Sequence, residues 1–105
     1  MNSIFLEVLM SAVDMDSCGI SARDHVDDPL NDALADAGVG EVSGGGSGKG
    51  MVIVDVEIFD ENRFPEALAI IRRVLLEVGA PANTVIQRNA PVKQRYGIQD
   101  PPGPS

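Results

Sequence analysis

The clearest hydrophobic pattern in the chain lies between residues 51 and 59, where the sequence reads MVIVDVEIF. Alternate residues of an extended chain point to opposite faces of a sheet. One face of this stretch is wholly apolar and consists of Val52, Val54, Val56 and Ile58. The other face is mixed and consists of Ile53, Asp55, Glu57 and Phe59. The pattern predicts a strand at Met51–Phe59 in an antiparallel sheet that is covered on one side only.

The next segment changes to a helical period. Apolar residues three and four positions apart form a stripe of Phe64, Ala67, Leu68, Ile71, Val74, Leu75 and Val78, which we expect to pack against the apolar face of the strand. The polar residues of the segment lie off this stripe: Glu66, Arg72, Arg73 and Glu77. Asp60 or Asn62 can cap the helix, and Pro65 suits its first turn. Gly79 can take the left-handed conformation that ends a helix.

The N-terminal part of the chain contains weaker signals. Ile4–Met10 alternates between apolar and other residues and predicts a buried strand. Residues 11–27 show little periodicity, so we expect a long loop there. Asp28 followed by Pro29 is typical of a helix start, and this short helix should end at Gly38.

The remaining strands are predicted to be short. One is expected at Gly40–Ser43, where it runs into the glycine tract Gly44–Gly50, which we interpret as a flexible, bulged hairpin connection. Another is expected at Thr84–Arg88, at an edge of the sheet. The sequence leaves open whether residues 92–98 add a further strand. Residues 101–105 are rich in proline and are expected to be disordered.

The predicted order of elements is strand, helix, strand, strand, helix, strand, which indicates an α+β fold. Two helices separated by a hairpin are typical of the ferredoxin-like split βαβ plait, a four-stranded antiparallel sheet with two helices on one face. We expect residues 1–88 to form this single domain and residues 89–105 to form a C-terminal extension. The uncovered face should carry four large apolar residues that suit a dimer or a partner: Phe5, Leu9, Ile53 and Phe59.

About half of the chain, Ala33–Arg88, resembles a group of small, uncharacterised bacterial proteins with a ferredoxin-like fold. The matching residues are AL-x-x-AG-x-GEV-x-GGG-x-G (Ala33–Gly48), the strand VIVDVEIFD, and AL-x-x-I-x-x-VL-x-x-x-GAP (Ala67–Pro81). Some such small acidic proteins are similar to immunity proteins of bacterial toxin systems. The resemblance implies a protein-binding role and implies no catalytic residues.

The chain is acidic, with a formal net charge of −8 over 105 residues. Residues 1–50 contain nine acidic and two basic residues, whereas residues 51–105 contain seven and six. Such a surface disfavours nucleic acid as a partner, because phosphate binding needs a basic patch, and it favours a basic protein. The predicted partner-binding residues are the acids that crowd one window of the chain: Asp24, Asp27, Asp28, Asp32 and Asp36.

Two short patterns approach known ligand-binding motifs without completing them. The glycine tract ends in the GK pair of a phosphate-binding loop, but Ser43 occupies the first glycine position and a strand follows instead of a helix. Asp14–Gly19 begins like a calcium loop, but Cys18 and His25 stand where oxygen ligands are needed. We therefore expect no metal, no nucleotide and no other cofactor.

Three classes of function remain. The first is a protein-binding module, most concretely an inhibitor or immunity protein that neutralises a basic bacterial toxin. The second is a homodimeric ligand-sensing or structural domain, and the third is a small enzyme that uses Cys18, His25 and the aspartates of residues 11–27. No catalytic residue is assigned. The absence of an apolar run of about 18 residues predicts no membrane span, and the single cysteine is compatible with a cytoplasmic location.

Overall fold

The computed structural model describes residues 3–20, 24–90 and 94–98. Its strands are β1 (Ile4–Ser11), β2 (Gly40–Gly48), β3 (Met51–Ile58), β4 (Val85–Ala90) and β5 (Gln94–Gly97). Its helices are α1 (Ala12–Ser17), α2 (Asp24–Ala37) and α3 (Phe64–Glu77), and a 3₁₀ turn, η1 (Glu61–Arg63), precedes α3. The fold class is α+β, which confirms that part of the prediction.

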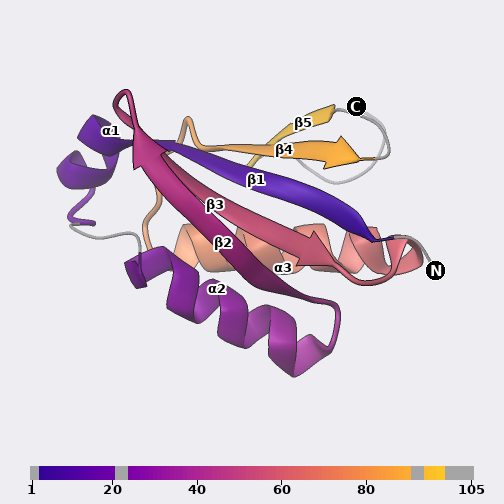
Figure 1. The fold of residues 1–105 in the computed structure, drawn as a ribbon. Helices are drawn as coiled ribbons and strands as arrows, with labels where there is room; N and C mark the ends of the chain where they lie inside the picture. Colours follow the sequence, from indigo (N-terminus) through magenta and orange to yellow (C-terminus); the bar gives the residue numbers. More distant parts are fainter. Residues whose placement is uncertain (1–2, 21–23, 91–93, 99–105) are drawn as a thin grey trace.

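The strands form one antiparallel sheet in the order β2-β3-β1-β4-β5 (Figure 1). The predicted four strands and two helices are wrong in number, because the described residues contain five strands and three helices. The fifth strand, β5, pairs with β4. The additional helix, α1, begins directly after β1, where Ser11 Oγ accepts a hydrogen bond from the Asp14 N–H at 3.3 Å and caps the helix.

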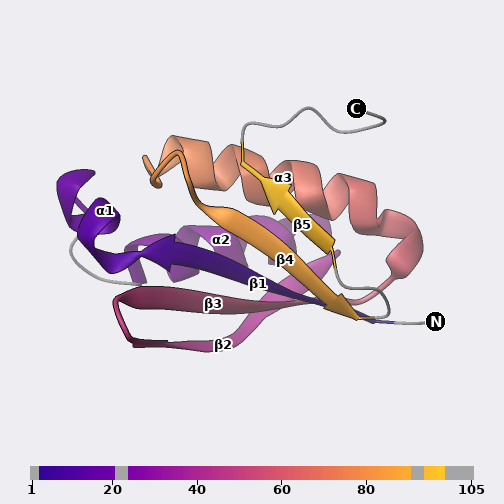
Figure 2. The same ribbon diagram turned by 90° about the horizontal axis from the view of Figure 1, so that it is seen from above.

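Helices α2 and α3 pack against each other and cover the same face of the sheet (Figures 1 and 2). The strand register joins three pairs of buried residues on this covered face: Ile4 with Ile58, Leu6 with Val56, and Val8 with Val54. The predicted stripe of α3 lies in the same core, with Leu68, Ile71 and Leu75 all buried. The covered face therefore forms the hydrophobic core of the molecule, as the alternating pattern of Met51–Phe59 predicts.

Helix α2 begins earlier than the sequence pattern indicates. It starts at Asp24 instead of Asp28, so residues 12–17 and 24–27 of the loop predicted at residues 11–27 are helical. Pro29 consequently lies inside the helix, where it removes a backbone hydrogen-bond donor. Val26 extends the buried stripe of Leu30 and Leu34 by one turn, and all three side chains are inaccessible to solvent. This additional burial offsets the cost of the internal proline.

The glycine tract lies in a strand that contains a bulge, as predicted. Strand β2 continues to Gly48, well beyond the predicted Gly40–Ser43, with one register shift between Val42 and Gly44. Lys49 and Gly50 form a tight hairpin turn with φ values of 52° and 78°, which are the positive values of a type I′ turn. The predicted flexible connection is therefore shorter than expected, because β3 provides a regular partner for nearly the whole tract.

The C-terminal strands differ from the prediction in extent and in place. Strand β4 spans Val85–Ala90 instead of Thr84–Arg88, and it lies between β1 and β5 instead of at the edge. Strand β5 takes the edge position within residues 92–98. The Tyr96 ring lies 5.7 Å from that of Phe64, which anchors β5 to α3. The disorder predicted for residues 101–105 lies outside the described residues.

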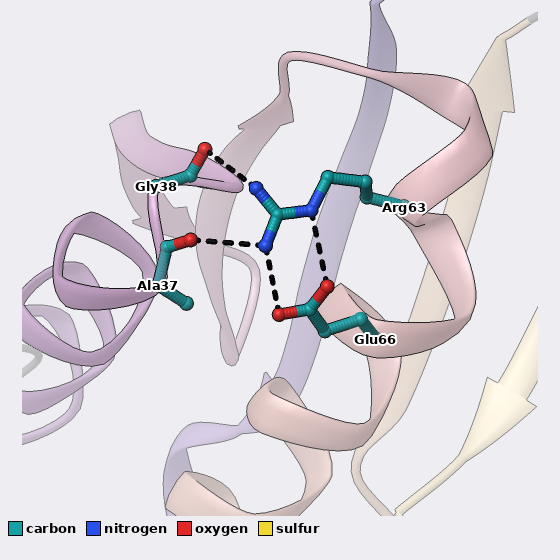
Figure 3. A network of polar contacts seen from close by, with 4 residues as sticks. All are labelled: Ala37, Gly38, Arg63 and Glu66. Atoms are coloured by element: carbon teal, nitrogen blue, oxygen red, sulfur yellow. Dashed lines mark hydrogen bonds and ion pairs between the residues drawn. The ribbon is translucent and has the colours of Figure 1, made fainter.

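Arg63 joins the end of α2 to the start of α3 (Figure 3). Its guanidinium donates to the backbone oxygens of Ala37 at 3.1 Å and Gly38 at 3.4 Å. Its Nε and Nη2 also donate to the two carboxylate oxygens of Glu66 at 3.0 and 2.9 Å. The cation thereby satisfies carbonyl groups at the negative end of α2.

The prediction that Arg72 lies off the apolar stripe of α3 is wrong, because the side chain is buried. The side chain is only 7% exposed, and its Nε donates to the Gly97 carbonyl oxygen at 2.9 Å. The long apolar stem of an arginine can be buried in this way while the head reaches a polar group. The contact fastens α3 to the end of β5, a strand that the sequence pattern did not establish.

Candidate functional site

The sheet face opposite the helices carries acidic and apolar side chains on adjacent strands. We call it the open face and define it by eight residues of β1, β2 and β3: Phe5, Glu7, Leu9, Glu41, Met51, Ile53, Asp55 and Glu57. These residues alternate along each strand with the buried residues of the covered face. Three of the four residues predicted for a dimer or partner face, Phe5, Leu9 and Ile53, therefore belong to one surface, and Phe59 directly follows β3.

The acids of the open face are paired with one another across the strands. The register places Glu7 opposite Asp55, and Glu57 opposite Glu41. Like charges directly opposite each other in a sheet are destabilising. Within the described part of the chain, the side chains of Asp55 and Glu41 form no hydrogen bond and no ion pair.

The other two acids of the open face do have polar neighbours. Glu57 accepts a hydrogen bond from Ser3 Oγ at 3.1 Å. Glu7 accepts one from Gln87 Nε2 at 3.3 Å, and Gln87 in turn accepts one from Arg95 Nε at 3.1 Å. The polar row thus runs from a cation on β5 through β4 to the acids of β1 and β3. Sequence reasoning missed Gln87 and Arg95, because only the strand register places Gln87 opposite Glu7 and Arg95 opposite Gln87.

Apolar side chains lie beside these acids. Leu9 stands between Ile53 on β3 and Val85 on β4, and all three are half-buried. Phe5 is 47% exposed and Phe59 is 43% exposed, which is unusual for large aromatic side chains. The open face therefore combines accessible apolar area with concentrated negative charge.

The five acids predicted to bind a partner all lie on α2, in the layer on the other side of the sheet. Asp24, Asp28, Asp32 and Asp36 are exposed and recur every four residues, so they follow one side of the helix. We call these four residues the acidic stripe. Asp27 is half-buried and already interacts within the protein, so it is separate from the stripe.

Two residues of the acidic stripe line a groove between α2 and α3. The groove has a volume of about 510 Å³ and is lined by Pro29, Asp32, Ala33, Asp36, Ala37, Ile70 and Arg73. No ion pair in the described part of the chain joins Arg73 to either aspartate. Arg73 is a neighbour that sequence reasoning missed, because α2 and α3 are far apart in the chain.

The residues considered for metal binding and catalysis do not lie in one segment: they belong to α1, to the position directly after α1, and to α2. Asp14 and Asp16 lie in α1, Cys18 directly follows that helix and is exposed, and His25 lies in the first turn of α2 and is exposed. No group of three or more metal-ligating side chains gathers among residues 3–20, 24–90 and 94–98. Asp14 accepts a hydrogen bond from Asn83 Nδ2 at 2.8 Å, which gives it a structural role.

Comparison with known proteins assigns no family to this chain, because no family model, characterised protein or solved structure matches it. The resemblance over Ala33–Arg88 therefore stays an expectation. Over the part of the chain that the structure describes, no helix is long and apolar enough to cross a membrane.

Proposed function

We propose that this protein is a protein-binding module whose open face docks a basic partner, in the manner of an inhibitor or immunity protein that covers a toxin. The succession β1, α2, β2, β3, α3, β4 supports a description of the fold as a split βαβ plait to which α1 and β5 are added. Such a fold serves many functions. The proposal therefore depends on the surface and not on the topology.

The observation that carries the proposal is the pairing of acids across the open face. Glu7 with Asp55, and Glu41 with Glu57, are unfavourable pairs in the isolated molecule. A lysine or arginine placed between two such carboxylates replaces their repulsion with two attractive contacts. A basic partner therefore gains binding energy from a surface that weakens the free protein.

The apolar residues of the open face add contact area next to the charges. Phe5 on the open face and Phe59 just beyond it are accessible without any rearrangement of the backbone, and aromatic side chains, Phe included, are enriched at the cores of protein–protein interfaces. A basic partner with an adjacent apolar patch would match both features. Two copies of the open face would instead bring acids against acids, so the same observation disfavours a homodimer through this face.

The acidic stripe on α2 has a different role in this proposal. It lies in the helical layer, so it does not share a contact surface with the open face. Charges outside a contact surface act at longer range and mainly raise the association rate of an oppositely charged partner. We propose that the stripe attracts the basic partner and that the open face binds it.

The test compares two variants that each remove two negative charges. Asp55→Asn with Glu57→Gln neutralises part of the open face, and Asp32→Asn with Asp36→Asn neutralises part of the acidic stripe. Each is used with the wild type to capture partners from the native cell, and captured proteins are then purified and titrated by calorimetry.

We expect a basic protein that binds the wild type and the stripe variant, and binds the open-face variant about tenfold or more weakly. A partner that binds the open-face variant as tightly as the wild type would show that the binding surface lies elsewhere. A captured partner that is acidic would contradict the proposal as a whole.

A further inference from the structure

The groove between α2 and α3 combines an apolar lining with charges of both signs. Its volume of about 510 Å³ lies within the range of roughly 300–1,000 Å³ that is usual for small-molecule sites. The half-buried apolar residues that line it are Ala33, Ala37 and Ile70. The exposed charged residues that line it are Asp32 and Asp36 on α2 and Arg73 on α3.

The charged side chains of the groove are not used within the protein. Among the described residues, the side chains of Asp32, Asp36 and Arg73 form no hydrogen bond and no ion pair. Two carboxylates and one guanidinium give the groove a net charge of −1. A ligand that complements it in full therefore carries two positive groups, one negative group and an apolar part that covers the lining.

The directions of the two helices set the order of these charges along the groove. Helices α2 and α3 run in opposite directions (Figure 1), and Arg63 joins the end of α2 to the start of α3. Because a helix advances by about 1.5 Å per residue, Arg73, Asp32 and Asp36 lie at roughly 14, 8 and 2 Å from this junction. The groove therefore presents one positive charge and then two negative charges in succession.

A basic amino acid carries the complementary charges in the same order. In lysine, a carboxylate is followed by the α-ammonium group and, after an alkyl stem, by the side-chain ammonium group. A carboxylate placed at Arg73 brings the α-ammonium group to Asp32 and directs the stem toward Asp36. The two aspartates are separated by about 6 Å along α2, a distance that the stem spans while it covers Ala33 and Ala37.

We propose that the groove between α2 and α3 binds a free basic amino acid. Arg73 holds the carboxylate, Asp32 holds the α-ammonium group and Asp36 holds the side-chain cation. Ion pairs at exposed positions are individually weak, so we expect a dissociation constant of about 1 mM for lysine. This binding needs no protein partner and is therefore independent of the docking proposed for the open face.

Three analogues of lysine test the three contacts, because each lacks one charged group. Cadaverine lacks the carboxylate, ε-aminocaproate lacks the α-ammonium group and norleucine lacks the side-chain ammonium group. The full-length protein is titrated with each compound at neutral pH and constant ionic strength, and amide chemical shifts along the groove are followed by NMR. We expect saturation with lysine and a dissociation constant about three- to fivefold higher for each analogue.

Variants assign each charged group of the ligand to its residue. Arg73→Gln should bind lysine and cadaverine equally, Asp32→Asn should bind lysine and ε-aminocaproate equally, and Asp36→Asn should bind lysine and norleucine equally. In each case the variant lacks the partner of the group that distinguishes the two compounds. Asp28→Asn is the matched control, since Asp28 is exposed on the same helix and does not line the groove. It should leave the dissociation constant for lysine unchanged.

The proposal is overturned by chemical shifts along the groove that do not saturate with lysine at concentrations up to about 50 mM. It is also overturned by a wild type that binds lysine and norleucine equally, because Asp36 would then make no contact with the ligand. A loss of binding in Asp28→Asn as large as that in Asp32→Asn would show that only the general negative charge of α2 attracts lysine, and this outcome too would exclude the site.

Discussion

The two faces of the sheet use the same three strands for opposite purposes. On the covered face, Ile4, Leu6 and Val8 meet Ile58, Val56 and Val54, and the helices remove them all from solvent. On the open face, the residues between them pair Glu7 with Asp55 and leave Phe5 47% exposed. Neighbouring residues of one strand thus contribute either to stability or to an unfavourable surface charge.

The comparison indicates that the open face, unlike the covered face, is not optimised for the stability of the isolated molecule. A face that served only to solubilise the molecule would gain from alternating the signs of opposed charges. The open face instead sets acids against acids in two cross-strand pairs. We interpret this cost as a sign that the face is kept for binding, while the covered face supplies the stability that makes the cost tolerable.

The largest expected effect belongs to the covered face. Ile71→Ala should lower the free energy of unfolding by about 2–5 kcal/mol, because the side chain is fully buried in the core and its removal leaves a cavity. Chemical denaturation measures the change. Leu76→Ala on the same helix is the control, since Leu76 is 51% exposed and should cost less than about 1 kcal/mol. Equal effects of the two variants would refute the assignment of the buried side of α3.

The next largest effect on stability is expected for the contacts by which Arg63 joins α2 to α3. Arg63→Ala removes the hydrogen bonds to the Ala37 and Gly38 carbonyl oxygens and should destabilise the protein by about 0.5–1 kcal/mol. Arg73→Ala removes a cation from the same layer that forms no ion pair with the described residues, and it should change stability by less than about 0.5 kcal/mol. Thermal unfolding of both variants would show whether the Arg63 contacts, and not the charge alone, hold α2 to α3.

A smaller effect of opposite sign is expected on the open face. Asp55→Asn should stabilise the isolated protein by about 0.2–1 kcal/mol, because it removes a repulsion and breaks no side-chain hydrogen bond among the described residues. The gain should shrink in added salt, which already screens the two carboxylates. A double-mutant cycle with Glu7→Gln isolates the pair, and a coupling energy of zero would mean that the opposed acids do not repel each other measurably.

The smallest effect on stability is expected for the acidic stripe. Asp32→Lys with Asp36→Lys should leave the free energy of unfolding nearly unchanged, because both side chains are exposed. With a purified partner, the same variant should slow association and flatten its dependence on salt, while the dissociation rate changes little. Stopped-flow kinetics measures these rates, and an unchanged association rate would leave the stripe as a solvated surface only.

Several features of this protein follow from the sequence alone. The alternation in Met51–Phe59 and the helical stripe after it predict β3, α3 and the contact between them, and the structure confirms all three. These predictions succeed because periods of two and of three to four residues are local properties of the chain. The same alternation separates Asp55 and Glu57 from Val54 and Val56, so the existence of an acidic and apolar open face is also visible in the sequence.

What the sequence pattern missed depends on contacts between distant segments. The start of α2 at Asp24 depends on the burial of Val26 under the sheet, and β5 depends on the packing of Tyr96 against Phe64. Local propensity at Pro29 and in residues 92–98 argues for a later helix start and leaves β5 undecided, and tertiary packing overrides it.

For the candidate surfaces, too, the sequence determines one part and the tertiary structure decides the other. The sequence determines which residues are acidic and which alternate with the core, but only the register sets Glu7 against Asp55 and Glu41 against Glu57. Likewise, only the sheet order leaves β2 at an edge. Register and strand order arise from the competition among long-range pairings, so the tertiary structure alone decides which charges face one another.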